Sequence, residues 1–255
     1  RSDLVTTVVG SLSNPYYGAL VDEIAREISG LGLELLLCMK PGEVVELQDS
    51  LATSASILLS PDLEILKAAA RSTPVVTVGA DPGCVDIAPD VSPDLASAYR
   101  EAAQTALEQG RCRFVYGCWE THFPRNHRKK FAFVDSVLVS RGMPAAEVCH
   151  TPRAVVDAVL KKPGAVDAVF CINDVFAVHV LAGLRQNGVR CPDDVLVFGC
   201  DGTLPVPGLW TIDLDFREIG LSVAGLLKRL LAGEKLAGQW LIRPKLRAPR
   251  AACGK

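Results

Sequence analysis

The sequence predicts an α/β protein built from two doubly wound parallel-sheet subdomains. Short apolar runs alternate with amphipathic helical stretches along most of its 255 residues. This alternation is typical of strands that are buried on both faces and joined by helical crossovers. The pattern restarts after Gly117, so a second half begins near residue 118.

The first half contains five predicted strands joined by helices. The strands lie at residues 4–9, 33–38, 57–59, 75–78 and 114–116, and the helices at 16–31, 43–53, 63–71 and 95–109. Leu20, Ile24 and Ile28 form one apolar stripe on the first helix, and Gly32 marks its end. Residues 79–91 are rich in Pro and Asp and are predicted to form a loop.

The second half is organised around residues 166–203. An apolar strand at 166–172, a helix closed by Gly188 and a strand at 195–198 form one βαβ unit. Further strands are predicted at 148–150, 211–214, 240–242 and 245–248, and further helices at 128–141, 155–162 and 216–231. The tail at 249–255 is expected to fray.

Three polar residues fall on one edge of this βαβ unit. Asn173 and Asp174 follow its first strand, and Asp201 follows its second. A right-handed crossover places all three at the carboxyl ends of the strands, where open α/β sheets bind ligands. Each residue type also caps helices or forms turns, so a structural role stands beside a binding role. Their occurrence on one edge favours a polar binding site.

Another group of candidates follows the first strand. Asn14, Tyr16 and Tyr17 lie in the loop and at the start of the helix after it. Aromatic rings at such an edge stack on the face of a sugar or base. The alternative is that the two rings pack against the core or a neighbouring subunit.

Composition excludes several classes of protein. Hydrophobic residues make up 49% and charged residues 22% of a chain with net charge −2, which indicates a globular protein without general attraction to nucleic acid or membranes. No apolar run is long enough to span a bilayer, and a strand begins almost at once, so no signal peptide is expected. The nine cysteines form no disulfide framework, which favours reduced thiols in the cytoplasm.

Neither a metal site nor catalysis is expected. Cys118, His122 and His127 lack the paired spacing and the fourth ligand of a structural zinc site. The sequence contains neither a Walker motif nor a G-x-G-x-x-G loop, so no cofactor is predicted. Cys200 has no nominated base nearby, so the chain is not expected to be an enzyme.

Taken together, these residues resemble the effector-binding region of LacI/GalR-type bacterial transcription regulators, whose fold is that of periplasmic sugar-binding proteins. The resemblance covers nearly the whole chain. It is carried by residues 13–17, 169–174, 188–195, 198–202 and 211–217.

The resemblance implies a periplasmic binding protein-like type I fold with three crossovers, near Gly117, Asp213 and Ala237. The expected subdomains are 1–117 plus 214–237 and 118–213 plus 238–255. It further implies a small effector, such as a sugar or nucleoside-like molecule, between the subdomains, and a homodimer.

Relatives of this type also carry an N-terminal helix-turn-helix headpiece that reads operator DNA. No basic helix pair precedes the strand at Leu4, so we expect the headpiece to be missing from this polypeptide. Operator DNA would be contacted only through that part. The alternatives are an exported solute-binding protein, which predicts a signal peptide upstream, and a sugar-processing enzyme, which requires an acid–base pair that we do not find.

The resemblance also nominates individual side chains. Asn173 and Asp201 match positions that hydrogen-bond the effector, and Asp174 is adjacent. An effector-contacting Arg stands four residues before a helical aromatic residue in this family. Counting back from Phe133 selects Lys129, and a shift of one residue selects Arg128. The alternative is that Arg128, Lys129 and Lys130 form a solvated helix face.

Overall fold

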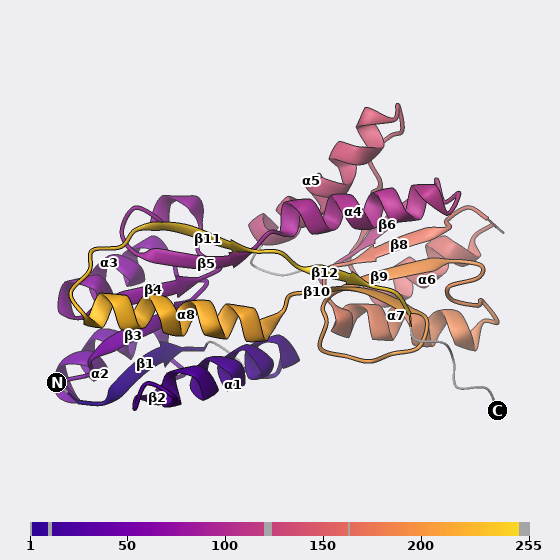
Figure 1. Ribbon diagram of the computed structural model, residues 1–255. Helices are drawn as coiled ribbons and strands as arrows, with labels where there is room; N and C mark the ends of the chain where they lie inside the picture. Colours follow the sequence, from indigo (N-terminus) through magenta and orange to yellow (C-terminus); the bar gives the residue numbers. More distant parts are fainter. Residues whose placement is uncertain (1, 10–11, 120–123, 163, 250–255) are drawn as a thin grey trace. The chain divides into compact units, whose positions relative to one another are not determined.

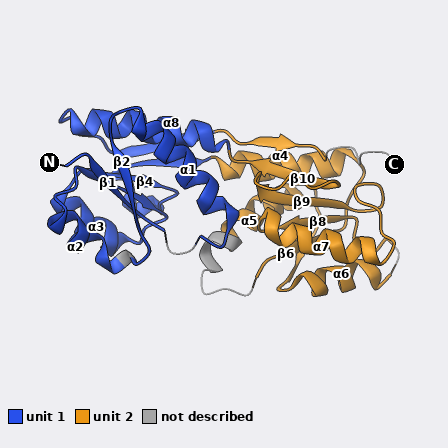
Figure 2. Cartoon of the chain, turned by 90° about the horizontal axis from the view of Figure 1, so that it is seen from below, with its two compact units in different colours: residues 1–93, 215–242 blue, residues 94–214, 243–255 orange. Residues whose placement is uncertain are grey.

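The computed structural model describes residues 2–9, 12–119, 124–162 and 164–249. The chain divides into two compact α/β units (Figures 1 and 2), and it passes between them three times. Unit 1 comprises residues 1–93 and 215–242, and unit 2 comprises residues 94–214 and 243–255. Each unit contains one six-stranded sheet, which confirms the predicted architecture of two doubly wound subdomains.

Unit 1 contains an entirely parallel sheet with strand order β11-β5-β4-β3-β1-β2. Its strands are β1 Leu4–Val8, β2 Glu34–Cys38, β3 Ala55–Leu59, β4 Val75–Val78, β5 Pro89–Pro93 and β11 Gly238–Ile242. Its helices are α1 Pro15–Ser29, α2 Val44–Ser50, α3 Leu63–Ser72 and α8 Phe216–Leu231, with short 3-10 turns at Pro41–Glu43 and Pro82–Cys84. Helix α1 packs against α8, and α2 packs against α3.

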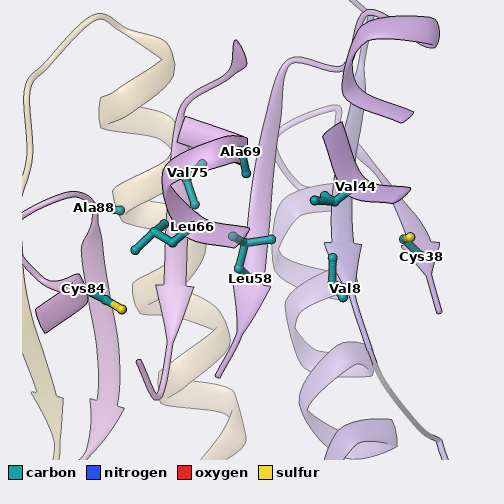
Figure 3. Close-up of a cluster of buried hydrophobic side chains, with 9 residues drawn as sticks. All are labelled: Val8, Cys38, Val44, Leu58, Leu66, Ala69, Val75, Cys84 and Ala88. Atoms are coloured by element: carbon teal, nitrogen blue, oxygen red, sulfur yellow. The ribbon is translucent and has the colours of Figure 1, made fainter. Parts of the chain in front are cut away.

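One apolar cluster in the core of unit 1 lies where strands meet helices α2 and α3, and buried side chains of α1 and α8 form a further part of that core. Leu58 of β3 and Val75 of β4 lie beside Leu66 of α3 in a buried cluster (Figure 3). Leu66 is fully buried, and the apolar area that such a side chain removes from water stabilises the unit by roughly 1.5–3 kcal/mol.

Unit 2 contains a sheet with strand order β12-β10-β9-β8-β6-β7, in which only the β10–β12 pair is antiparallel. Its strands are β6 Phe114–Gly117, β7 Glu147–Cys149, β8 Ala168–Cys171, β9 Leu196–Asp201, β10 Leu209–Asp213 and β12 Lys245–Arg247. Its helices are α4 Leu95–Glu108, α5 Pro124–Ser140, α6 Pro152–Leu160 and α7 Asp174–Gln186. The rings of Phe170 and Phe198 stack at 4.5 Å between β8 and β9.

The first crossover differs from the sequence expectation. The second crossover, after residue 214, falls close to the one expected near Asp213, but the first follows Pro93 instead of Gly117. The third follows Ile242, so β11, which the boundary expected near Ala237 assigned to the second subdomain, pairs with β5 in the first sheet. Strand β6, expected in the first sheet, pairs with β7 and β8 of the second. Helix α4 and strand β6 therefore belong to unit 2.

Strand β5 takes the place in the first sheet that was expected for residues 114–116. The start of β5 falls in the stretch predicted as a loop. A loop was predicted there because prolines and aspartates, of which β5 contains two and one, are unusual in a strand. Asp90 is nevertheless fully buried, and its Oδ1 accepts hydrogen bonds from Thr77 Oγ1 at 2.8 Å and from the Ala80 amide at 2.9 Å. These hydrogen bonds offset the cost of removing the Asp90 carboxylate from water, although sequence patterns place aspartates on the protein surface.

Within the described ranges, none of the helices has the length and apolar character needed to span a bilayer.

Candidate functional site

The carboxyl edge of β8 and β9 in unit 2 brings the predicted polar residues together. The two strands are adjacent and parallel, so the residues that follow them share one edge, as expected. Asn173 is half-buried and caps α7, where its Oδ1 accepts a hydrogen bond from the Phe176 amide at 2.9 Å. The capping role that the sequence left open is therefore present.

Asp174 ties the start of α7 to the turn that follows β9. Its side chain is completely buried, and it accepts hydrogen bonds from Thr211 Oγ1 at 2.6 Å and the Thr203 amide at 3.0 Å. Burial raises the pKa of this carboxyl group to about 6, although hydrogen bonds from Thr211 and from backbone amides of the turn oppose the shift. Asp174 thus holds the shape of the edge.

Asp201 ends β9 in a strained backbone conformation. Its φ of 107° lies in a region that non-glycine residues seldom occupy, and its side chain is only 5% exposed. Burial raises the pKa of this carboxyl group to about 7, attraction to Lys130 lowers it, and repulsion from Asp174 raises it. Such strain is concentrated at binding sites, where the surrounding fold maintains it.

Lys130 is the residue of α5 whose basic side chain reaches this edge. Its Nζ donates a hydrogen bond to the Ile172 carbonyl at 3.1 Å and lies 3.6 Å from Cys200 Sγ. Burial lowers the pKa of this ammonium group, but the acidic groups of Cys200, Asp201 and Asp174 outweigh burial and leave it raised.

Arg128 and Lys129, the two candidates from the family pattern, are exposed on the same helix. Lys130 reaches the edge instead because it lies on the buried face of α5. Val134 and Val137, one and two turns further along that face, are both buried. Counting back from these valines selects Lys130, whereas counting back from Phe133 selects Lys129.

One buried hydroxyl group near the same edge, Thr203 Oγ1 of the turn after β9, has no hydrogen-bond partner among the described residues. The Tyr99 hydroxyl of α4 is also buried and faces the Cys200 thiol. The ammonium group of Lys130 is 6.0 Å from the centre of the Tyr99 ring. Burial raises the pKa of Tyr99 well above its usual value, and it raises the pKa of the neighbouring Cys200 thiol to about 12.

The turn after Asp201 is held by β10 and β12. The Gly202 amide donates to Thr211 Oγ1 at 3.2 Å, and its carbonyl accepts from Arg247 Nη2 at 2.6 Å. Arg247 Nε also lies 3.2 Å from Asp213 Oδ2. Gly202 has φ 74°, and a Cβ there would lie 2.8 Å from the Asp213 Cα, so only glycine fits.

The remaining candidates lie in unit 1, at the carboxyl end of β1. Asn14 is the N-cap of α1, and its Oδ1 accepts a hydrogen bond from the Tyr16 amide at 3.1 Å. The Tyr16 ring centre lies 5.0 Å from that of Tyr17 and 5.6 Å from that of Phe216 at the start of α8. Both tyrosines are half-buried, so they pack within unit 1 and still present part of each ring.

Within the described residues, no cluster of three or more metal-ligating side chains occurs. Cys118 Sγ lies 3.7 Å from His150 Nδ1 in a pair that lacks further ligands there. His122 and the side chain of His127, which were weighed with Cys118 as ligands, lie outside the described part. The eight cysteines that the structure describes are all free thiols.

Comparisons with known proteins agree on one family. The family model described as "Periplasmic binding protein-like domain" matches residues 103–248. The HTH-type transcriptional regulator DegA of Bacillus subtilis is 24% identical over 269 residues, which cover 96% of this chain and 79% of the relative.

Solved structures of regulators share the fold. A putative LacI-family regulator from Rhizobium etli superposes with TM-score 0.84 at 20% identity, covering 99% of each chain. A LacI-family regulator from Arthrobacter sp. FB24, solved in complex with lactose, gives TM-score 0.83 at 21% identity and covers 96% of this chain and 98% of its own.

Proposed function

Because the chain belongs to the periplasmic binding protein-like domain family of LacI/GalR-type transcription regulators, we propose that it binds a small neutral or polar effector and transmits that signal to a DNA-binding headpiece. The observation that carries the proposal is the edge of unit 2. Two adjacent parallel strands end there, with Asn173 just after β8 and Asp201 at the end of β9. The ammonium group of Lys130 reaches the same edge from α5 and attracts Asp201. In open α/β sheets that edge is the ligand-binding edge.

Sugars and nucleoside-like molecules are the effector classes that this edge supports. Carboxylate side chains accept hydrogen bonds from hydroxyl groups, and amide side chains both accept them from hydroxyl groups and donate them to hydroxyl oxygens or ring nitrogens. Tyr16 and Tyr17 offer half-exposed rings at the corresponding edge of unit 1, suited to the apolar face of a sugar or base. The lactose complex of the Arthrobacter regulator supports a sugar for this chain.

The effector acts by population shift. It binds one conformation of the domain more tightly than another and so changes the fraction of molecules whose headpieces grip operator DNA. In this proposal the headpiece is an N-terminal helix-turn-helix, the regulator is cytoplasmic, and the domain itself catalyses no reaction. DNA contact is made by the headpiece alone.

The proposed regulator is a homodimer joined through unit 1. Strand β2 forms an edge of the first sheet, and Leu37 and Met39 at its end are 42% and 48% exposed. Unpaired apolar edges of this kind favour association with another chain. Sedimentation equilibrium should give a dimer for the wild type and a larger fraction of monomer for Leu37→Glu.

Calorimetric titration tests the sensing function. The panel contains D-ribose, lactose, cellobiose and adenosine, titrated into the wild type, Asp201→Ala and Asp157→Ala. Asp157 is an exposed residue of α6 and serves as the matched control. We expect at least one compound to bind, and Asp201→Ala to weaken it by roughly 10-fold or more through loss of a charged hydrogen-bond partner. If Asp201→Ala and the wild type bind a compound with equal affinity, Asp201 is not part of the site. If no compound of the panel binds, sugar or nucleoside sensing is contradicted.

A further inference from the structure

The edge that carries Asp174 and Asp201 constrains the charge of the effector, and this inference rests on the sensing function proposed above. Two basic side chains contact the edge, Lys130 from α5 and Arg247 from β12. A phosphate or carboxylate effector requires a cation that is available to pair with it. The partners of these two side chains therefore decide what the edge accepts.

Lys130 is already engaged by groups of unit 2. Its ammonium group donates to the Ile172 carbonyl oxygen at 3.1 Å and lies 3.6 Å from the Cys200 sulfur. Attraction between Lys130 and Asp201 acts on both groups. Recruiting this ammonium group to an anionic effector would strip the buried Asp201 carboxylate of its neighbouring positive charge.

Arg247 is occupied in the same way. One arm of its guanidinium group donates to the Gly202 carbonyl at 2.6 Å, and Nε lies 3.2 Å from an oxygen of Asp213. These contacts fix the turn that follows Asp201, so Nε and Nη2 of the guanidinium group are engaged by protein groups.

The two buried carboxyl groups leave the edge acidic once both are ionised. Asp174 is 0% exposed and Asp201 is 5% exposed, while Lys130 is the one cation that acts on Asp201 in the described part of unit 2. A second anion placed against them meets like charge in a region shielded from water, where repulsion is screened little.

The hydroxyl groups of a neutral ligand would not be repelled by the two carboxylates, and they could hydrogen-bond to polar groups of the edge. The hydroxyl of Thr203 is buried near the edge and makes no hydrogen bond among the described residues. Buried polar groups normally have a partner, supplied by protein, water or ligand. A polyhydroxylated ligand or the water it orders supplies such partners without bringing a charge.

We propose that Lys130 and Arg247 are kept occupied by unit 2 itself, and that Asp201 therefore selects uncharged, hydroxyl-rich effectors and rejects their phosphorylated or carboxylated forms. Lys130 is a specificity-determining residue in this arrangement. It neutralises Asp201 from within the protein and does not receive an anion from the effector.

Matched ligand pairs test this rule by calorimetry at pH 8, where Asp201 is ionised and a phosphate monoester is a dianion. The pairs are D-ribose with D-ribose 5-phosphate, D-glucose with D-glucose 6-phosphate, and adenosine with adenosine 5′-monophosphate. D-glucose 6-O-methyl ether adds bulk without charge at the phosphorylated position. We expect one neutral member to bind at least ~10-fold more tightly than its phosphate, since like-charge juxtaposition at a binding surface is costly. The methyl ether separates loss by charge from loss by size.

Asp201→Asn supplies the second measurement. It removes one negative charge and keeps an acceptor oxygen, so the ratio of the two dissociation constants in a pair should shrink towards one. Lys161→Gln, an exposed change at the end of α6, should leave the ratio as in the wild type.

Three results contradict the rule. A phosphate that binds as tightly as its neutral partner overturns it, and so does a methyl ether that is rejected as strongly as the phosphate. A ratio that Asp201→Asn leaves unchanged removes Asp201 as its cause. If no member of any pair binds, the sensing function fails first, and the charge rule falls with it.

Discussion

The ammonium group of Lys130 lies 3.1 Å from the carbonyl oxygen of Ile172, the residue that follows β8. This contact joins helix α5 to the edge of the sheet at which Asn173 and Asp201 lie. It places a positive charge among buried groups, where it counters Asp201 and, more weakly, Asp174. The stability of unit 2 and the chemistry of its candidate site are therefore linked through one side chain.

Replacing Lys130 by Met should destabilise unit 2. The change removes the donor to the Ile172 carbonyl and the charge that favours ionised Asp201, at an expected cost of about 1–3 kcal/mol in the free energy of unfolding. Urea denaturation measures the loss. Lys161→Met, at an exposed position, should change stability by less than about 0.5 kcal/mol. Equal effects of both substitutions would show that the contact contributes nothing.

Most elements of the fold were predictable from apolar periodicity, and the exceptions have physical causes. Strand β8 and helix α7 follow the predicted strand and helix closely because their apolar residues repeat at strand and helix spacing. Strand β5 was not predicted because its residues lack an apolar strand pattern. The hydrogen bonds that stabilise its polar side chain come from residues distant in sequence. The Asp90 carboxylate accepts from Thr77 and from Gln239, which is 149 residues away. No local pattern contains such a partner.

The candidate site was predictable in part for the same reason. The end of a strand can be read from the end of its apolar run, so the sequence placed Asn173, Asp174 and Asp201 on one edge. Their contact with an effector stays a prediction. Which basic residue of α5 reaches that edge depends on the rotation of a helix packed in three dimensions. The buried Val134 and Val137 carry this information, but the family spacing from Phe133 points one residue away.

Acidic pH should stabilise unit 2 through Asp174 and Asp201. Their pKa values of about 6 and about 7 lie above the value of about 3.9 for an aspartate in an unfolded chain. Between about pH 4 and pH 7 the folded state therefore binds more protons than the unfolded state, so the free energy of unfolding falls as pH rises. We expect a loss of about 2–4 kcal/mol between pH 5 and pH 8 from the two groups together.

Chemical denaturation at pH 5, 6, 7 and 8 measures this slope in the wild type and in Asp201→Asn. The variant lacks the group with the larger shift, so its stability should fall less over the same range. Identical slopes would mean that Asp201 titrates alike in the folded and unfolded chains.

Glycine at position 199 is required by the close approach of α7 to β9. A Cβ at Gly199 would clash with the Asp174 carboxylate and lie 3.2 Å from the Asp174 Cα. Because Asp174 is itself held by Thr211, Gly199→Ala should cost about 1–3 kcal/mol through overpacking. Gly225→Ala in α8 meets no atom within 4 Å and should instead stabilise the protein by about 0.5–1 kcal/mol. Thermal unfolding distinguishes the opposite signs, and a loss of stability in both variants would refute the explanation.

Arg247 should control the order of the turn that follows Asp201. Its guanidinium group binds both the Gly202 carbonyl and Asp213, so one side chain connects β12, β10 and the turn. Arg247→Met removes both contacts, and Arg247→Lys keeps the charge but cannot reproduce the fork. Hydrogen exchange of the amides of residues 202–204 should rise by roughly 10-fold in the Met variant, the change expected for about 1.4 kcal/mol of lost local stability, and by less in the Lys variant. Arg153→Met, which affects only an exposed ion pair on α6, should leave these amides unchanged. Unaltered exchange in Arg247→Met would show that Thr211 and Asp174 hold the turn without help from β12.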